Sequence, residues 1–279
     1  MLFVIICILL GAYLAGNVVS QAIRLYAMGI PLFPGPLETT ESPLARVASV
    51  GREVAISTFL RFLWPLGLLP QRLPRSVEKS LHPPVIVIHG MSMNHTSMFP
   101  LQWWLRQKGW TTLSFDWSGG NLSLELAAHH LAQRIQLLQQ ITGVTQFDLV
   151  CHSAGGLIAR YFVECLAGGP SVRKLITLGT PHQGARMALF GWGLVSRDLL
   201  PGSPFLARLG MVKGIDYTSL AGEMDSIVFP PASTRLGPPC QDITLPGLGH
   251  NTLLAHAAAF QQIREALLRE NLAIQEASP

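Results

Sequence analysis

The sequence predicts an α/β protein: a minimal, doubly wound, mostly parallel sheet of about six strands with helices on both faces. Apolar runs of strand length alternate with helix-length segments over residues 81–279, and this alternation is typical of a parallel sheet. Glycine-rich turns follow several of the runs. In such sheets functional side chains lie beyond the carboxyl ends of the strands, so these turns are the places where a functional site is expected.

Six runs have the composition of buried strands, and helix-length segments separate them. The predicted strands are Val85–His89, Trp110–Phe115, Phe147–Cys151, Val172–Leu178, Ile215–Leu220 and Gln241–Leu245. The predicted helices are Met98–Lys108, Ser123–Ile141, Ala154–Ala167 and Asn251–Asn271.

The first 23 residues carry no charged side chain, and Leu2–Val19 is almost continuously apolar. A helix of eighteen such residues is about as long as the hydrocarbon core of a bilayer is thick. We therefore expect residues 1–23 to form a single transmembrane helix. A cleaved signal peptide and a buried core helix are the alternatives, although no basic residue precedes the run as it does in signal peptides.

Residues 24–80 are predicted to link this helix to the domain, because four prolines lie between residues 31 and 43. Within the linker, Val54–Leu69 is again mostly apolar. Two interpretations are open for it. It is either an amphipathic segment in the bilayer interface, with Trp64 at headgroup depth, or a helix packed on the domain.

Composition excludes two classes of protein. Hydrophobic residues make up 49% of the 279 and charged residues 13%, which excludes a disordered chain. The net charge is +4, of which residues 1–84 contribute +3 (seven basic and four acidic side chains). The remaining chain is nearly neutral, which argues against binding of nucleic acid, since that requires clustered cations.

The third predicted strand leads directly into Ser153 and then into a helix, in the segment Cys-His-Ser-Ala-Gly-Gly. A strand, a serine and a helix in immediate succession are typical of a nucleophile elbow, a tight turn that exposes the serine hydroxyl. The residues two before and two after the serine must be small. Gly155 meets this requirement, and Cys151 stands where glycine is usual. A tight turn with a capping serine is the alternative.

Other polar residues follow other predicted strands. His89 and Gly90 follow the first, where the glycine allows the chain to bend so that the N–H of Met91 points at the site. Asp225 follows the fifth strand, and His250 follows the sixth on a glycine-rich loop. For the imidazole role His182 is the rival of His250, and for the carboxylate role Glu223 is the nearest substitute. The histidines and acids lack the spacing of metal ligands, so no metal site is predicted.

Taken together, these motifs and the segment Gly-Thr-Pro-His-Gln-Gly at residues 179–184 resemble the α/β-hydrolase superfamily. Within it the chain resembles bacterial triacylglycerol lipase-like esterases with an N-terminal membrane segment. The resemblance covers about Pro84–Phe260, and the order serine, aspartate, histidine along the chain agrees with it.

The resemblance implies a catalytic triad and an oxyanion hole, without a cofactor. Ser153 would be the nucleophile, Asp225 the acid and His250 the base, while the N–H groups of Met91 and Ala154 would be the oxyanion donors. Further substrate contacts are expected from His89, Gly90, His152, His182 and Trp192.

The implied reaction is cleavage of a carboxylic ester, with a lipid or acyl ester as the substrate, because the chain combines a membrane segment with an apolar insert at residues 183–211. This insert is either a lid or acyl groove above the serine, or a helix pair that completes the core. An acyltransferase or thioesterase with the same triad is an alternative function, as is an inactive membrane-bound scaffold.

The expected location is a bacterial inner membrane. Arg24, Arg46 and Arg52 follow the apolar run and favour a cytoplasmic position for the catalytic domain. The sequence indicates no oligomeric state.

Overall fold

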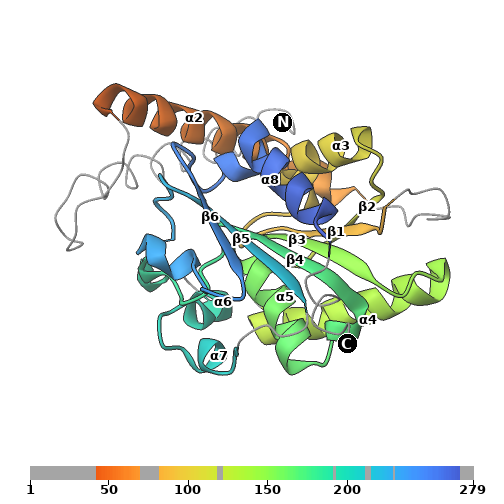
Figure 1. The fold of residues 1–279 in the computed structure, drawn as a ribbon. Helices are drawn as coiled ribbons and strands as arrows, with labels where there is room; N and C mark the ends of the chain where they lie inside the picture. The colour runs from red at the N-terminus through yellow and green to blue at the C-terminus, as the bar shows by residue number, and fades with distance from the viewer. Residues whose placement is uncertain are drawn as a thin grey trace, which may run out of the picture.

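The computed structural model describes residues 42–69, 82–117, 122–190, 193–210, 215–228 and 230–270. Six strands form one sheet in which all neighbouring strands are parallel (Figure 1). All six predicted strands are confirmed, with ends that differ by no more than two residues. The strands are β1 (Val85–Ile88), β2 (Thr112–Phe115), β3 (Phe147–His152), β4 (Val172–Leu178), β5 (Asp216–Gly222) and β6 (Gln241–Leu245).

The spatial order of the strands is β2-β1-β3-β4-β5-β6. The chain therefore passes from β1 out to β2, and then returns to place β3 on the other side of β1. At such a reversal of the strand order, the crevice beyond the carboxyl ends of the strands is the preferred place for a ligand. The turns that follow β1 and β3 lie on either side of this crevice.

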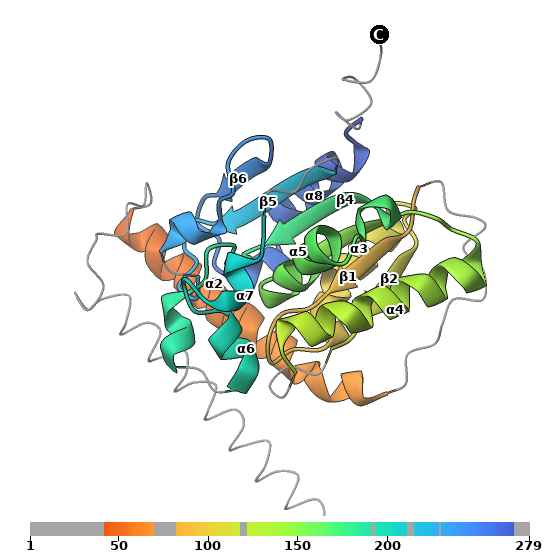
Figure 2. The same cartoon turned by 90° about the horizontal axis from the view of Figure 1, so that it is seen from below.

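Helices cover both faces of the sheet, as Figures 1 and 2 show. Helices α3 (Phe99–Gln107) and α8 (Ala257–Leu268) lie on one face, and α4 (Leu124–Thr142) and α5 (Ala154–Cys165) lie on the other. The ends of α4 follow from local sequence. The Ser123 side chain accepts a hydrogen bond from the N–H of Leu126 at 3.2 Å, and Gly143 ends the helix with a φ of 69°.

The two faces of the sheet have separate apolar cores. Ile86 and Ile88 of β1 belong to the core beneath α4 and α5, while Val85 and Val87 belong to the core beneath α3 and α8. Consecutive side chains of a strand point to opposite faces, so a strand that is covered on both sides must be apolar throughout. This explains the uninterrupted apolar run by which β1 is recognised in the sequence.

The segment expected to be a linker contains a long helix. Residues 43–62 form α2 (Pro43–Phe62), and η1 (Trp64–Leu68) follows it. The helix starts as its sequence allows: the Ser42 hydroxyl accepts a hydrogen bond from the N–H of Ala45 at 3.3 Å, and Pro43 occupies the first turn. Leu60 is buried in the same core as α3 and α8, so α2 packs on the folded domain.

One face of Val54–Leu69 packs on the domain, as the second of the two interpretations expects, with Leu60 in the core. Its other face exposes large apolar side chains to solvent: Phe62 is 65% exposed and Leu68 73%. The predicted transmembrane helix at residues 1–23 lies outside the described residues. Within the described ranges, no helix is both long enough and apolar enough to cross a bilayer.

The insert at residues 183–211 contains η4 (Arg186–Phe190), α6 (Gly193–Asp198) and α7 (Pro204–Ala207). Val195, Leu199 and Phe205 are buried in the core beneath α4 and α5. Phe205 also stacks on Tyr161 of α5, with ring centroids 5.3 Å apart. For these residues the structure agrees with a helix pair that completes the core rather than with a lid.

The last predicted helix begins later than expected. Residues Thr252–Leu254 form a 3₁₀ turn, η6, and α8 starts at Ala257. His256 separates them because its backbone is extended (φ −116°, ψ 135°), and its Nδ1 accepts a hydrogen bond from the N–H of Ala258 at 3.2 Å. The histidine thus acts as an N-cap, which the sequence pattern did not indicate.

Candidate active site

Ser153 lies between the end of β3 and the start of α5, in a backbone conformation (φ 52°, ψ −126°) that is strained for a residue with a side chain. Neighbouring elements hold it there. Its N–H donates to the carbonyl oxygen of Leu178 at 2.8 Å, and its own carbonyl oxygen accepts from the hydroxyl of Thr180 at 2.9 Å. A strained serine between a strand and a helix is the geometry of the predicted elbow.

Small residues around Ser153 are a steric requirement. A Cβ at residue 155 would lie 2.6 Å from the carbonyl oxygen of His89, and a Cβ at residue 90 would lie 2.9 Å from the Cβ of Ser153. Glycine is therefore needed on both sides of the elbow. Cys151, two residues before the serine, stands where glycine is usual and is fully buried. Burial raises the pKa of its thiol well above the usual value, so the side chain stays uncharged.

Asp225 and His250 form a buried pair. His250 Nδ1 lies 2.7 Å from Asp225 Oδ2. The other carboxylate oxygen, Oδ1, accepts the N–H groups of Ile227 at 2.8 Å and Val228 at 2.9 Å, so the aspartate is held in one orientation. A neutral imidazole that donates from Nδ1 to a carboxylate has an unprotonated Nε2. This is the form that can accept a proton from a hydroxyl group.

Ser153 and His250 line the same pocket, which has a volume of about 160 Å³. Gly90, Met91 and His152 also line it, so the structure brings five of the predicted site residues together. The rest of the wall comes from the turn after β1, from the loops near Asp225 and His250, and from α2 and η1. These residues are Ser92, Met93, Asn94, Ser97, Ile227, Asn251, Leu60, Arg61 and Trp64.

The two predicted oxyanion donors flank Ser153. Ala154 is the first residue of α5, and the first N–H groups of a helix have no partner within it and lie at the positive end of its dipole. Met91 follows Gly90 in the turn after β1 and lines the pocket. An anionic oxygen that develops beside Ser153 could be stabilised from both directions.

His89 holds the turn that carries Met91, and it does not line the pocket. Its Nδ1 donates to the carbonyl oxygen of Gly90 at 2.8 Å, and its Nε2 accepts the N–H of Trp117 at 3.2 Å. The indole of Trp117 in turn donates to the His89 carbonyl oxygen at 2.9 Å. His89, predicted as a substrate contact, therefore fixes the backbone behind the pocket.

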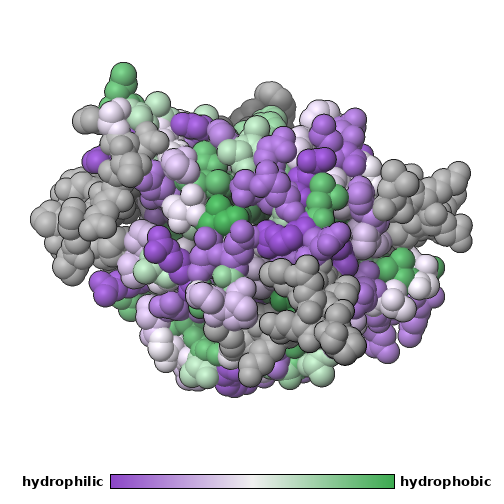
Figure 3. Space-filling model, viewed as in Figure 1, coloured by the Kyte–Doolittle hydropathy of each residue, from purple (hydrophilic) through white to green (hydrophobic). Residues whose placement is uncertain are grey.

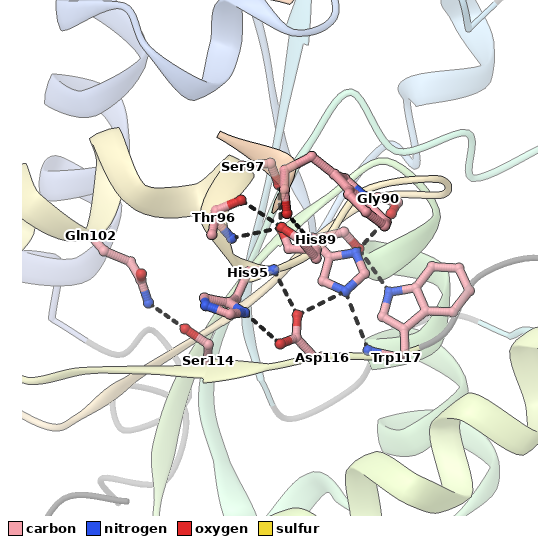
Figure 4. A network of polar contacts seen from close by, with 11 residues as sticks. His89, Gly90, His95, Thr96, Ser97, Gln102, Ser114, Asp116 and Trp117 are labelled. Carbon is pink, nitrogen blue, oxygen red and sulfur yellow. Dashed lines mark hydrogen bonds and ion pairs between the residues drawn. The ribbon is translucent and has the colours of Figure 1, made fainter. Parts of the chain in front are cut away.

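Asp116 extends this network to the surface. Its Oδ1 lies 3.3 Å from His89 Nε2, and its Oδ2 lies 2.6 Å from His95 Nδ1 (Figure 4). Burial raises the pKa of this carboxyl group, but the contacts with His89 and His95 outweigh burial and lower the pKa overall. The carboxylate thus stays charged, and it binds both the N–H and the Nδ1 of His95 in the turn after β1.

His152 is fully buried next to Ser153. Its Nε2 donates to the carbonyl oxygen of His250 at 3.2 Å, and the two imidazole rings lie 4.6 Å apart. Its Nδ1 has no hydrogen-bond partner among the described residues. Burial lowers the pKa of His152 well below its usual value, so the ring is neutral and adds no charge beside His250.

The structure does not bring His182 into the pocket. This histidine is buried against β4 and β5, where its Nε2 lies 2.8 Å from the hydroxyl of Tyr217 and 3.1 Å from that of Thr177. It therefore fixes the loop after β4 rather than contacting a substrate in this pocket. Trp192, the other predicted contact in the insert, lies outside the described residues.

Sequence reasoning missed the contribution of α2 and η1 to the pocket. Leu60, Arg61 and Trp64 line it, although they lie 89 to 93 positions before Ser153 in the chain. A usable signal was present in Ser42 and Pro43, since a serine followed by proline marks a helix start. A helix could thus have been predicted, but its place beside the pocket could not.

The chain is similar to known proteins in sequence and in fold. Residues 84–197 match the family model described as palmitoyl protein thioesterase. Among solved structures, the mature form of the lipase BlEst2 of Bacillus licheniformis is similar with a TM-score of 0.57 at 16% identity, over 71% of this chain and 95% of that one. The propeptide form gives 0.61 at 18%, over 68% of this chain and 51% of that one.

A lipase B of Aspergillus fumigatus gives a TM-score of 0.60 at 15% identity, over 73% of this chain and 56% of that one. The chain has the α/β-hydrolase fold. At these identities the structures establish the fold alone. The match to the thioesterase model is consistent with a hydrolase of the esterase or thioesterase type.

Adding one carbon at Gly155 should destabilise the protein, since the new Cβ would lie 2.6 Å and 2.8 Å from the carbonyl oxygens of His89 and Ile88. We expect Gly155→Ala to lower the free energy of unfolding by about 1–3 kcal/mol. Gly51→Ala is the control, because a Cβ there meets nothing within 4 Å. That variant should raise the free energy by about 0.5–1 kcal/mol. Urea denaturation measures both, and equal effects of the two substitutions would contradict the steric account.

Stability should fall as the pH is lowered below about 6.5. Burial lowers the pKa of both His152 and His182 well below the usual value, so below pH 6.5 the unfolded chain binds protons that the folded chain does not. Each histidine then removes about 1.4 kcal/mol of stability per pH unit. We expect His182→Gln to show a shallower loss of stability between pH 7 and pH 5 in urea denaturation. The same pH dependence in variant and wild type would refute the burial of a neutral His182, and His152→Asn offers a second comparison.

Proposed function

We propose that this protein is a serine hydrolase that cleaves carboxylic esters through Ser153, His250 and Asp225. One observation carries the proposal: a serine in a strained turn at φ 52° shares a pocket with a histidine whose Nδ1 lies 2.7 Å from a buried carboxylate. No cofactor is needed, because all the groups of the reaction are side chains and backbone N–H groups of this chain.

The reaction would proceed in two halves through an acyl-enzyme. The Ser153 oxygen attacks the ester carbonyl while His250 Nε2 takes the proton of the Ser153 hydroxyl. Asp225 stabilises the resulting imidazolium. The tetrahedral oxyanion is bound by the N–H groups of Met91 and Ala154, each donor of this kind contributing about 3 kcal/mol. His250 then returns the proton to the departing alcohol. In the second half, water attacks the acyl-Ser153 ester and gives a proton to His250. His250 returns that proton to the Ser153 oxygen as the carboxylic acid leaves.

Lipid or acyl esters are the proposed substrates. The pocket wall is largely apolar, with Leu60, Trp64, Met91, Met93 and Ile227 around the serine. Such a wall favours a hydrocarbon chain over a polar metabolite, since burying each CH₂ group contributes about 0.8 kcal/mol.

Attachment to a membrane is part of the same proposal. The uncharged first 23 residues support it, as do the exposed apolar side chains of α2 and η1, the segment that lines the pocket with Leu60 and Trp64. On the face drawn in Figure 3, which carries α2 and α8, apolar groups stand among mostly hydrophilic ones, so this face as a whole is not an apolar surface. We propose a single N-terminal span in a bacterial inner membrane with the catalytic domain in the cytoplasm. The exposed apolar side chains are Leu44, Val47, Phe59, Phe62, Trp64, Leu66, Leu68 and Leu69.

Thioester hydrolysis is the second candidate, because residues 84–197 match a palmitoyl protein thioesterase model. The same serine, histidine and oxyanion donors can act on either bond. Rates on an oxygen ester and a thioester with the same acyl chain distinguish the two. A kcat/KM that is at least about tenfold higher for the thioester would favour the second candidate.

Removing the Ser153 hydroxyl should abolish the chemistry and leave the fold intact. We expect a fluorophosphonate probe to label the wild-type protein and not Ser153→Ala, whose esterase activity should fall by at least about 10³-fold. Ser171→Ala is the control, because Ser171 precedes β4 at the opposite end of the sheet. Probe labelling or near wild-type activity in Ser153→Ala would refute the assignment of the nucleophile.

Acyl chain length tests the substrate class. With p-nitrophenyl esters, we expect kcat/KM to be several-fold higher for butanoate to octanoate than for acetate, because a longer chain buries more apolar surface in the pocket. A steep preference for acetate would contradict the proposal that lipid esters are the substrates.

A further inference from the structure

Helix α2 is attached to the loop that carries His250. The carboxylate of Glu53 accepts three hydrogen bonds from the two residues that follow His250. Its Oε1 accepts the N–H of Asn251 at 2.8 Å, and its Oε2 accepts the N–H and the hydroxyl of Thr252 at 2.9 Å and 2.7 Å. Hydrogen bonds to a charged acceptor are about twice as strong as those between neutral groups. The backbone directly after His250 is therefore fixed by a residue 198 positions earlier in the chain.

Two serines on the same face of α2 reinforce this contact. Ser49, Glu53 and Ser57 are spaced four residues apart, so their side chains lie on one face of the helix. The Ser49 hydroxyl donates to the carbonyl oxygen of Gly247 at 2.7 Å, and the Ser57 hydroxyl accepts from the side-chain amide of Asn251 at 2.8 Å. Three successive turns of α2 thus hold the His250 loop before and after the histidine.

The loop also approaches the helix too closely for a side chain. A Cβ at Gly249 would lie 2.5 Å from Oε2 of Glu53. Glycines at 247 and 249 give this loop little conformational restraint of its own, since glycine loses more conformational freedom on ordering than any other residue. The contacts with α2 supply the restraint.

The other end of the segment is attached to the turn that carries Met91. The side-chain amide of Asn94 donates to the carbonyl oxygen of Trp64 at 2.8 Å, and the hydroxyl of Thr96 donates to that of Leu63 at 3.1 Å. Between the two attachments, Leu60 and Trp64 line the pocket. The segment 43–68 therefore connects the loop with the proposed base to the turn with a proposed oxyanion donor.

We propose that α2 and η1 belong to the active site, and that Glu53 is a positioning residue for His250. This inference rests on the proposed function. Asp225 orients the imidazole ring, and Glu53 fixes the backbone from which the ring extends. A displacement of about 1 Å between reacting groups can cost about 10²-fold in rate, so loss of the Glu53 contacts should slow the chemical step.

The test is Glu53→Gln in the full-length protein, with Glu265→Gln as the matched control. Glutamine keeps the size of the side chain but turns an NH₂ group toward N–H and O–H donors. Glu265 lies exposed on α8, where it accepts from Gln262, so the control removes the same charge without touching the loop. We expect Glu53→Gln to lower kcat by about 10- to 100-fold with KM within about twofold. The rate of fluorophosphonate labelling of Ser153 should fall in parallel, and Glu265→Gln should change neither.

A purely structural role predicts a different outcome. In that case Glu53→Gln would have a lower melting temperature, while kcat per correctly folded molecule and the labelling rate would equal those of the wild type. That result would overturn the inference. If Glu53→Gln does not fold, Ser57→Ala provides a milder loss on the same face of α2, with a smaller fall in kcat as the expected result and an unchanged kcat as the contradicting one.

Failure of the proposed function would be separately visible. A wild-type protein that neither hydrolyses esters nor reacts with the probe at Ser153 would refute the proposed function itself. A wild-type protein that does both, beside a Glu53→Gln variant with unchanged kcat, would refute only the role of Glu53.

Discussion

The strained backbone of Ser153 is the constraint on which the rest of the site depends. The serine keeps a φ of 52° because β3 feeds straight into α5, and because Leu178 and Thr180 bind its N–H and carbonyl groups. The first turn of α5 packs so tightly on the end of β1 that only glycine fits at position 155. Contacts from β4, from the loop after β4 and from the end of β1 thus hold a backbone strain of about 1–3 kcal/mol at Ser153.

This constraint places the serine at the reversal of strand order between β1 and β3. The turn after β1 and the loop after β6, which carry the other proposed catalytic groups, are each held by residues outside the pocket. The turn after β1 is held by His89 and Trp117 from behind and by Asp116 through His95. The loop after β6 is held by α2 from outside the sheet. Neither support contacts the serine. Both act by fixing a short glycine-containing turn whose own sequence would allow several conformations.

The predictable part of the molecule is the part determined by local sequence. β1 is recognised because burial on both faces makes it apolar throughout, and Ser153 because a strand and a helix flank it directly. The role of Glu53 could not be predicted, because its partners lie 198 positions away and nothing in their local pattern refers to it. His182 shows the converse. Its motif suggested a pocket residue, but the hydroxyl of Tyr217, contributed by β5, holds it against the sheet and outside the pocket.

The most direct test of the triad and the oxyanion hole is a crystal structure of the protein with a long-chain phosphonate covalently bound to Ser153. We expect the phosphoryl oxygen to lie within about 3 Å of the N–H groups of both Met91 and Ala154. We also expect Nε2 of His250 to lie within hydrogen-bond reach of the adduct while Nδ1 remains bound to Asp225. An adduct on another residue, or one whose oxygen points away from both N–H groups, would refute the proposed site.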